Sequence, residues 1–356
     1  MHEIRRSDAL ALASWYENNK RALPWRDTGD PYDVWLSEIM LQQTRIEAVR
    51  EKFILFKKEL PTIETLASCP EDRLMRLWEG LGYYNRARNL QKCAKVLMEQ
   101  YDGHLPENYE TLLSLPGIGS YTAGAIASIA FHIAVAAVDG NVLRVLARYT
   151  KDTRDVRNPQ VKKETEELIQ NLFHDEEVRK QAHLFNQGLM ELGETICLPK
   201  GNIQCDNCPW HSSCAAHREN LTDSIPYRSA LKQRKIIQRT LLIIRDGHRF
   251  ILHKRPATGL LAGLYEFIGI DTDLSIDKAI QETEELGFHA LHVKELPASR
   301  HIFTHLEWHM KAYEIQCEEI ETLPGTDYIA KEKKELAHTA VPSAFKTYLD
   351  WYNLRD

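Results

Sequence analysis

The spacing of hydrophobic residues changes character about two thirds of the way along the chain. Between residue 8 and about residue 216, apolar positions recur with the helical period. The clearest helical segments are residues 9–16, 34–56, 72–84, 87–101 and 161–173. From Arg239 the pattern alternates, and an Asp246-Gly247 turn separates the run Arg239–Arg245 from a second apolar run at Phe250–Lys254. The sequence therefore predicts a helical domain followed by a domain that begins with a β-hairpin.

We expect three parts: a helical domain at residues 1–217, a linker at 218–238 and a second domain at 239–356. The linker is polar and basic and has no clear period. The second domain continues with a strand at 265–268, a helix near 276–286, an alternating stretch around 301–317 and a closing helix near 341–352. Such a mixture predicts a small α+β unit.

Length and composition restrict the class of protein. A chain of 356 residues, 43% hydrophobic and 27% charged, is long enough for two globular domains with cores of their own. It has no run of 18 apolar residues and no signal-peptide core at its N-terminus, so we expect no membrane association and a cytoplasmic, nucleoid-associated protein. A net charge of −6 excludes a histone-like polycation but allows DNA binding through one basic face.

The segment Leu115–Gly124 is the most informative in the chain. Gly117 and Gly119 lie in a five-residue turn, which lets backbone amides approach an anion, and the small-residue helix that follows presents its positive N-terminus. A DNA phosphate fits this arrangement. Asp139 follows one short helix and loop later, where a carboxylate can face the sugar. The segment resembles the motif of helix–hairpin–helix DNA glycosylases, although a tight turn between two helices would also explain it.

Four cysteines form the second strong signal. Cys197, Cys205, Cys208 and Cys214 are separated by seven, two and five residues. Four thiolates so close together can hold a [4Fe-4S] cluster or zinc, while disulfides are disfavoured in a reducing compartment. Glycosylases that resemble endonuclease III carry a [4Fe-4S] cluster in a loop here, at residues 197–214 in this chain, usually with a first gap of six residues. We expect the cluster, with one additional loop residue.

Several further motifs resemble the adenine DNA glycosylase (MutY) family, a branch of the helix–hairpin–helix/endonuclease III superfamily with a C-terminal Nudix-like domain. The segments Leu23–Arg26, Val34–Thr44 and Leu81–Arg88 match that family, and the resemblance covers essentially the whole chain. It implies an all-α helix–hairpin–helix core followed by a small α+β Nudix-like domain. It also implies a monomer that removes adenine mispaired with 8-oxoguanine, or with guanine, from double-stranded DNA during base excision repair.

Two carboxylates are candidates for the chemistry. An adenine anion is a poor leaving group, so the base must be protonated as it departs. Glu38 is one helical turn before Gln42 and, if desolvated, would keep a raised pKa and act as the general acid, whereas periodicity alone would place it on a solvated helix face. Asp139 would stabilise the cationic sugar. The resemblance implies that Asn141 orients these groups and that Tyr121 supports the transition state; helix capping and packing are the simpler roles for these two.

The resemblance also assigns the binding residues. Base flipping costs a few kcal/mol and leaves a gap in the duplex, for which Gln42 and Tyr83 are the candidates. The adenine pocket would comprise Trp25, Arg26 and Gln43, although Trp25 could equally be a core residue. The full predicted set of DNA-contacting residues is Gln42, Thr44, Leu81, Gly82, Tyr83, Gly117, Gly119, Thr304 and His305.

Tyr121 separates two enzymes of this fold. Endonuclease III-like glycosylases have a lysine at this position, and its amine forms a Schiff base with the sugar and leads to strand cleavage. A phenol cannot do this, so we expect a monofunctional enzyme that leaves an abasic site. The alternatives are a bifunctional pyrimidine-lesion glycosylase and lyase, and a non-catalytic lesion-binding iron–sulfur protein.

The second domain resembles a Nudix domain from which the hydrolase motif has been lost. The segment Gly263–Phe267 matches its start, but Ile280 and Gln281 occupy the positions of the Arg-Glu pair that a magnesium-dependent hydrolase needs. In place of the family's Phe-Ser-His lesion-reading loop the chain has Phe303-Thr304-His305, and threonine keeps the hydroxyl. We expect His301, His305 and His309 on one strand face, in contact with solvent or DNA and not with a metal.

Overall fold

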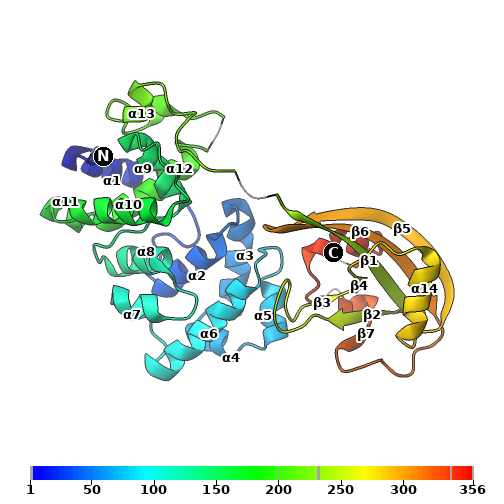
Figure 1. Cartoon of the computed structure of the whole chain (residues 1–356). Helices are drawn as coiled ribbons and strands as arrows, with labels where there is room; N and C mark the ends of the chain where they lie inside the picture. The colour runs from blue at the N-terminus through cyan, green and yellow to red at the C-terminus, as the bar shows by residue number, and fades with distance from the viewer. Residues whose placement is uncertain (1–2, 200, 231–232, 337–338, 355–356) are drawn as a thin grey trace. The chain divides into compact units, whose positions relative to one another are not determined.

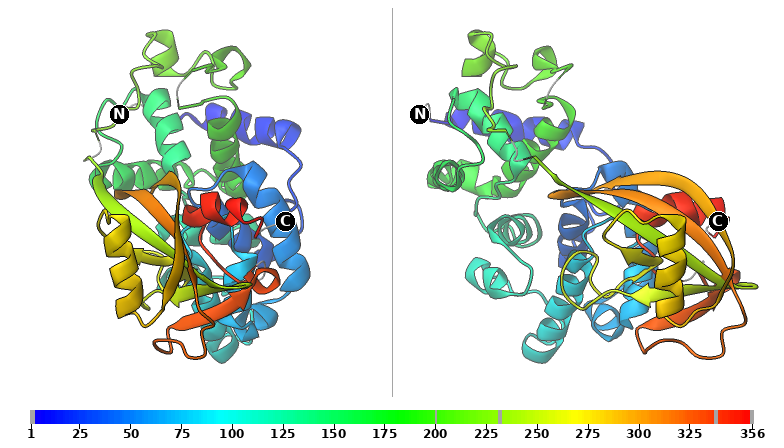
Figure 2. Two further views of the ribbon diagram at one scale, coloured as in Figure 1. Left: turned by 90° about the vertical axis from the view of Figure 1, so that its right-hand side faces the viewer. Right: turned by 45° about the vertical axis from the view of Figure 1, so that its right-hand side comes forward.

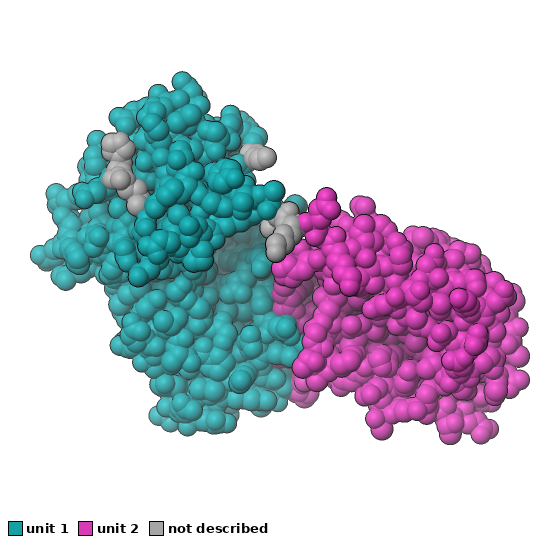
Figure 3. Space-filling view, in the orientation of Figure 1, with its two compact units in different colours: residues 1–69, 85–230 teal, residues 70–84, 231–356 magenta. Residues whose placement is uncertain are grey.

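The computed structural model describes residues 3–199, 201–230, 233–336 and 339–354. The chain folds into two compact units, coloured teal and magenta in Figure 3. Unit 1 comprises Met1–Cys69 and Asn85–Ala230, and unit 2 comprises Pro70–Tyr84 and Leu231–Asp356. None of the helices in the described part of the chain has the length and apolar character needed to cross a bilayer.

Unit 1 is helical, as its apolar period predicts (Figure 1). Its helices are α1 (Arg6–Asn19), α2 (Pro31–Leu41), α3 (Ile46–Glu59), α4 (Ile63–Ser68), α6 (Asn85–Gln100), α7 (Tyr109–Ser114), α8 (Ser120–Phe131), α9 (Gly140–Thr150), α10 (Pro159–Leu172), α11 (Glu176–Lys180), α12 (Ala182–Thr195), the 3-10 helix η1 (Cys205–Asn207) and α13 (Ala215–Arg218). The segment 34–56, which reads as one apolar run, forms two helices, because the chain turns after α2 and Gln43 adopts a left-handed φ of 59°.

Local sequence sets the limits of the helices that carry the site. Pro31 begins α2, a position that suits proline because it has no amide hydrogen to leave unpaired. Asp30 caps the helix by accepting a hydrogen bond from the Tyr32 amide. α8 begins after Gly119 and ends at His132, which adopts a left-handed conformation. Asp139 caps the start of α9. Each of these signals is local, and together they place Glu38, Tyr121 and Asp139 on separate elements.

α12 organises the core of unit 1 by packing against α1, α8 and α9. Many apolar side chains of these helices are fully buried, among them Leu12, Val142 and Phe185. Trp210, in the cysteine-containing loop, is buried in the same core, and its indole Nε1 donates to the carbonyl of Asp8 at 2.8 Å. The cysteine loop is thereby fixed to the first helix.

Gly124 allows the close approach of two segments near the site. A Cβ atom at this position of α8 would lie 2.3 Å from the carbonyl oxygen of Ala136, a distance that the rigid backbone cannot accommodate. Residues 136–138 are buried and lead directly to Asp139. The missing side chain at Gly124 therefore determines how closely Asp139 can approach α8, which carries Tyr121.

Unit 2 contains helix α5 (Glu71–Leu77) and, over its described residues, a seven-stranded mixed sheet. The strands are β1 (Lys235–Asp246), β2 (Arg249–Lys254), β3 (Tyr265–Glu266), β4 (Ile268–Ile270), β5 (Ala290–Ile302), β6 (Leu306–Cys317) and β7 (Tyr328–Glu332). The main order is β3-β2-β1-β6-β5, with β4 paired to β1 and β7 to β2. Only the pairing of β1 with β6 is parallel within the described sheet.

Helices cover both faces of this sheet, so its central strand is apolar on both sides. Leu242 and Ile244 of β1 join a core with Ala279 of α14 (Ile276–Glu285). Leu241 and Ile243 join the opposite core, which includes η2 (Ser343–Phe345) and α16 (Lys346–Trp351); α15 (Lys333–Leu336) follows β7. The left view of Figure 2 shows yellow α14 and the red C-terminal helix on opposite sides of the strands.

The structure confirms the first hairpin and, besides the break in segment 34–56, differs from the sequence interpretation at three places. Arg245 of β1 pairs with Phe250 of β2, as the Asp-Gly turn predicts. The alternating stretch around 301–317 is not one strand but the end of β5, a connection and β6, so His301 and His309 lie on neighbouring strands and His305 lies between them. Of the predicted helical segment 72–84, only α5 is helical, because Gly80 and Gly82 adopt positive φ.

The third difference concerns the predicted linker at 218–238. Its last residues already belong to β1, which begins at Lys235. Its middle part packs on unit 1: the Ile225 side chain is buried, its carbonyl accepts from Arg148 Nε at 2.7 Å, and Tyr227 forms a bridge with Asp155. The segment is mostly polar and is held by a buried arginine of α9, Arg148. Its packing on unit 1 therefore produces no hydrophobic period in the sequence.

Candidate active site

A cavity of about 1030 Å³ lies in unit 1 between α1, α2, α8, α12 and the start of α9. The walls include nine of the residues that the sequence predicts for catalysis and binding: Trp25, Arg26, Glu38, Gln42, Gln43, Thr44, Tyr121, Asp139 and Asn141. They come from positions more than 110 residues apart in the chain. The volume is within the range of small-molecule sites and is large enough for a nucleotide.

Glu38 projects from α2 into this cavity and is only 8% exposed. The Tyr121 hydroxyl donates a hydrogen bond to Glu38 Oε2 at 2.5 Å. Burial raises the pKa of Glu38 to about 7, and Asp139 also raises it, although the Tyr121 bond and the charge of Arg26 lower it in part. Burial therefore favours the protonated form of Glu38, which is the form that a general acid requires.

Asp139 caps the start of α9 and also forms part of the cavity wall. Its Oδ1 accepts hydrogen bonds from the Asn141 amide at 2.9 Å and the Val142 amide at 2.8 Å. Burial raises the pKa of Asp139, while the two amides and Arg144 oppose the increase. The cap fixes the carboxylate in the cavity wall, facing the same space as Glu38.

Asn141 and Tyr121 connect the carboxylates to their surroundings. The Asn141 side-chain Nδ2 donates to Glu194 Oε1 at 2.7 Å, and Asn141 Oδ1 accepts from Arg144 Nη2 at 2.9 Å. Burial and the charge of Glu38 raise the pKa of Tyr121 well above its usual value, so the phenol stays protonated and remains a donor.

The N-terminal segment and the turn after α2 form the other side of the cavity. Trp25 is 7% exposed and packs edge-on against Phe53 with ring centroids 5.3 Å apart, so it is both a core residue and part of the cavity wall. Gln42 donates to the Thr122 hydroxyl at 3.4 Å. The Arg86 guanidinium binds the carbonyls of Ile39, Met40 and Gln42, which satisfies the end of α2 and holds the turn that carries Gln43 and Thr44.

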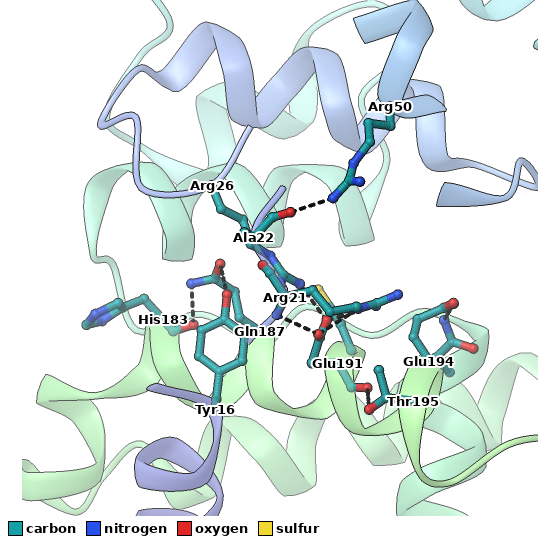
Figure 4. A network of polar contacts seen from close by, with 12 residues as sticks. Tyr16, Arg21, Ala22, Arg26, Arg50, His183, Gln187, Glu191, Glu194 and Thr195 are labelled. Atoms are coloured by element: carbon teal, nitrogen blue, oxygen red, sulfur yellow. Dashed lines mark hydrogen bonds and ion pairs between the residues drawn. The ribbon is translucent and has the colours of Figure 1, made fainter. Parts of the chain in front are cut away.

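The cavity wall contains a second polar group that the sequence motifs did not reveal, drawn in Figure 4. Glu191 of α12 accepts from Arg21 Nε at 2.7 Å, from Arg21 Nη2 at 2.9 Å and from Arg26 Nη2 at 2.6 Å. Burial alone would raise the pKa of Glu191, but the two arginines outweigh it and lower this pKa to about 2. One turn earlier, Gln187 accepts from the Tyr16 hydroxyl at 2.8 Å. Gln187 and Glu191 are four residues apart and lie on one face of α12. This spacing is the only sign of the polar group that we find in the sequence.

The hairpin glycines Gly117 and Gly119 lie between α7 and α8. Gly117 has a φ of 77°, and a Cβ there would lie 2.7 Å from Asn89 Cβ, so only glycine fits without displacement. Gly119 is the residue before α8 and has no side chain to cover the first amides of that helix. This arrangement suits the approach of a phosphate.

The remaining predicted DNA-contacting residues belong to unit 2. Tyr83 adopts a φ of 47°, and its hydroxyl is 2.6 Å from the Thr304 hydroxyl. The Trp78 indole donates to the Gly82 carbonyl at 3.0 Å. Thr304 and His305 lie in the connection between β5 and β6, where the Phe303 ring packs edge-on against Trp308. Leu81, Gly82, Tyr83, Thr304 and His305 are not part of the cavity lining in the described structure.

The four predicted cluster ligands lie together after α12. Cys197 influences the pKa of each of Cys205, Cys208 and Cys214 electrostatically, and Arg148 donates to Cys197 Sγ at 3.1 Å. Burial raises the pKa of Cys208 to about 12, so its thiolate needs a cationic partner. Among the described residues no group of three or more His, Cys, Asp and Glu side chains is arranged to hold a single metal ion. In number and type, the four thiols are the donor set that a [4Fe-4S] cluster would need.

Comparison with known proteins gives consistent results for both units. The HhH-GPD superfamily of base excision DNA repair proteins matches residues 36–172, and the NUDIX domain family matches residues 239–351. The adenine DNA glycosylase of Homo sapiens is 32% identical over 95% of this chain and 73% of its own length. That of Buchnera aphidicola subsp. Baizongia pistaciae is 37% identical over 72% of each chain.

Solved structures support the fold of the helical part. A thermostable thymine-DNA glycosylase, 29% identical, covers 60% of this chain and 97% of its own with a TM-score of 0.53. An endonuclease III trapped in a covalent complex with DNA, 22% identical, covers 61% of this chain and 96% of its own with a TM-score of 0.50, a likeness of fold alone.

The helical fold, the hairpin glycines and the two carboxylates in one cavity define a helix–hairpin–helix base excision DNA glycosylase with a C-terminal mixed-sheet NUDIX domain. Within that class, the chain belongs to the adenine DNA glycosylase family, as its identity with relatives over most of both chains shows. The resemblance that the sequence motifs indicated is thereby confirmed.

Proposed function

We propose that the protein removes adenine from double-stranded DNA in which adenine is paired with 8-oxoguanine or, more slowly, with guanine. It hydrolyses the N-glycosidic bond as a monomer and leaves an abasic site. The observation that carries this proposal is the buried Glu38 carboxyl, bonded to Tyr121 and placed with Asp139 around one cavity. The family membership supplies the substrate base.

The two carboxylates divide the reaction between them. Protonated Glu38 donates its proton to a ring nitrogen of adenine, so the base leaves as a neutral molecule. The bond electrons depart with the base, and the sugar acquires positive charge that the Asp139 carboxylate stabilises. Water then adds to the anomeric carbon and gives its proton to the Glu38 carboxylate, which completes the hydrolysis and restores the acid. Tyr121 and Asn141 keep the two carboxylates in position.

The pocket residues supply recognition of the flipped base. Trp25 offers an aromatic wall, and Arg26 and Gln43 offer polar groups that can bind the adenine edge. Gln42 and Tyr83 would occupy the gap left in the duplex, while Thr44 and the hairpin glycines Gly117 and Gly119 bind the backbone. Leu81 and Gly82 belong with Tyr83 to residues 81–88, the wedge segment that would enter this gap.

The NUDIX domain would recognise the oxidised guanine. Thr304 presents a hydroxyl that can donate and accept at the β5–β6 connection, and His305 is its neighbour. The Glu284 carboxylate, part of the degenerate hydrolase motif, accepts from the Ala290 amide at 2.8 Å and contacts His289 at 2.9 Å. It therefore serves the local fold, in agreement with a reader domain that does not hydrolyse nucleotides.

A [4Fe-4S] cluster bound by Cys197, Cys205, Cys208 and Cys214 would provide a structural support next to α9 and α12. The purified protein should contain about four iron atoms and equivalent acid-labile sulfide. Cys205→Ser should lower both and destabilise unit 1, whereas Cys93→Ser, at a buried cysteine outside the loop, should leave the iron content unchanged. One bound zinc in place of iron would contradict this assignment.

The pH dependence of excision tests the role of Glu38. Because the acid must be protonated, the single-turnover rate of adenine release should be high below pH 7 and fall about tenfold per pH unit above it. The measurement uses duplexes with adenine opposite 8-oxoguanine, guanine or thymine. Release opposite the two guanines only, with this pH profile, supports the proposal; release opposite thymine at an equal rate contradicts it.

A further inference from the structure

Glu191 lies at the wall of the cavity and contacts neither Glu38 nor Asp139 through any hydrogen bond described here. Its side chain is 1% exposed, while those of its partners Arg21 and Arg26 are 32% and 13% exposed. Figure 4 shows both guanidinium groups converging on this carboxylate. The single negative charge of Glu191 is thus paired with two positive charges at the cavity wall.

We propose that Glu191 is a positioning residue that fixes Arg26 in the cavity wall and compensates the positive charge that Arg26 presents to Glu38. This inference rests on the proposed function, because it concerns the acid of that reaction. It assigns to α12 a part in the chemistry that the catalytic motifs on α2, α8 and α9 do not reveal.

The position of Arg26 makes the compensation necessary. Arg26 is close enough for its positive charge to lower the pKa of Glu38, in opposition to burial, which raises it. Its Nη1 donates to the Arg21 carbonyl at 3.0 Å and its Nη2 donates to Glu191, so the guanidinium is held at two points. Without Glu191, the full charge of Arg26 would act on Glu38 across a poorly screened cavity.

Other charged or titratable groups also surround Glu38 and Glu191 and contribute to the electrostatic potential in the cavity. Tyr121, Asp139 and Arg26 face Glu38. Tyr16, Arg21 and Arg26 interact electrostatically with Glu191. Asp27, Glu47 and Glu194 act on those partners. The other charged or titratable residues of the cavity wall are Glu17, Lys20, Arg45, Tyr121, His132, Asp139 and His183. Arg21 and Arg26 are the two that bond to the Glu191 carboxylate among the described residues.

The test compares the pH profiles of single-turnover adenine release for charge variants of the full-length protein. Glu191→Gln removes the negative charge and should move the midpoint of the rate decrease to lower pH by about half a unit to one unit. Arg21→Gln leaves Glu191 with one guanidinium and should move the midpoint in the opposite direction. Glu191→Asp keeps the charge and should restore the midpoint close to that of the wild type.

Opposite shifts for the two charge variants separate this role from simple structural support, which would lower rates without moving the profile. The inference is overturned if the midpoint stays at the wild-type pH in both Glu191→Gln and Arg21→Gln. If Glu191→Gln does not fold, Arg21→Gln and Glu191→Asp still decide the matter. A wild-type protein that releases no adenine would instead overturn the proposed function, so the two failures are distinguishable.

Discussion

Glu38→Gln should lower the single-turnover rate of adenine release by about 10³-fold. Glutamine has nearly the same volume and can still accept a hydrogen bond from Tyr121, but it has no proton to give to the leaving base. Binding of the mispaired duplex should persist, because the hairpin and wedge segments are unchanged. The measurement pairs excision under single-turnover conditions with a binding titration on the same duplex.

Asp8→Asn is a matched control for this variant. Asp8 is also 8% exposed and bonds to a tyrosine, accepting from Tyr149 at 2.5 Å, but it lies outside the cavity. Its replacement should affect stability and leave the excision rate within a few fold of the wild type. Excision by Glu38→Gln at a rate comparable to that of Asp8→Asn would show that Glu38 is not the acid.

Asp139→Asn should lower the rate of adenine release by about 10²–10³-fold, the usual effect of removing one electrostatic contact to a developing charge. Asparagine can still cap α9 through its carbonyl oxygen, so the start of the helix should be preserved. The variant therefore isolates the charge of Asp139 from its structural role. Excision rates and melting temperatures of the variant and the wild type provide the measurement.

Asp175→Asn provides the corresponding control for helix capping. Asp175 caps α11 by accepting from the Glu177 and Val178 amides, as Asp139 does for α9, but it is not part of the cavity. We expect this control to excise adenine at the wild-type rate. If the loss of activity in Asp139→Asn is fully explained by a smaller folded fraction at the assay temperature, Asp139 has a capping role alone.

Much of the site could be predicted because its signals are local. The glycines of the hairpin are required by backbone conformation at Gly117, and the cap at Asp139 is set by the two amides that follow it. Glu38 and Tyr121 could be assigned from the motifs around them, which the comparisons place in a known family. What the motifs could not give is the 2.5 Å contact between these two residues, or the burial that raises the pKa of Glu38 in spite of that contact.

The polar group around Glu191 was not predictable from local signals. Arg21 and Glu191 are 170 residues apart, and each is an ordinary choice for a helix end or a helix face. The packing of α12 against α1 brings them together and buries Glu191, whereas the Arg21 side chain stays 32% exposed. The break between α2 and α3 was missed for a similar reason, because the turn is held by Arg86 from a different segment and not by glycine or proline.

The most direct test follows adenine and the DNA strand in the same reaction. A duplex with adenine opposite 8-oxoguanine is treated with excess protein, and free adenine is quantified together with strand breaks before and after alkali. We expect one adenine released per duplex, with breaks appearing only after alkali and no adduct trapped by borohydride, because Tyr121 cannot form a Schiff base. Strand breaks without alkali, accompanied by a trapped adduct, would contradict a monofunctional adenine glycosylase.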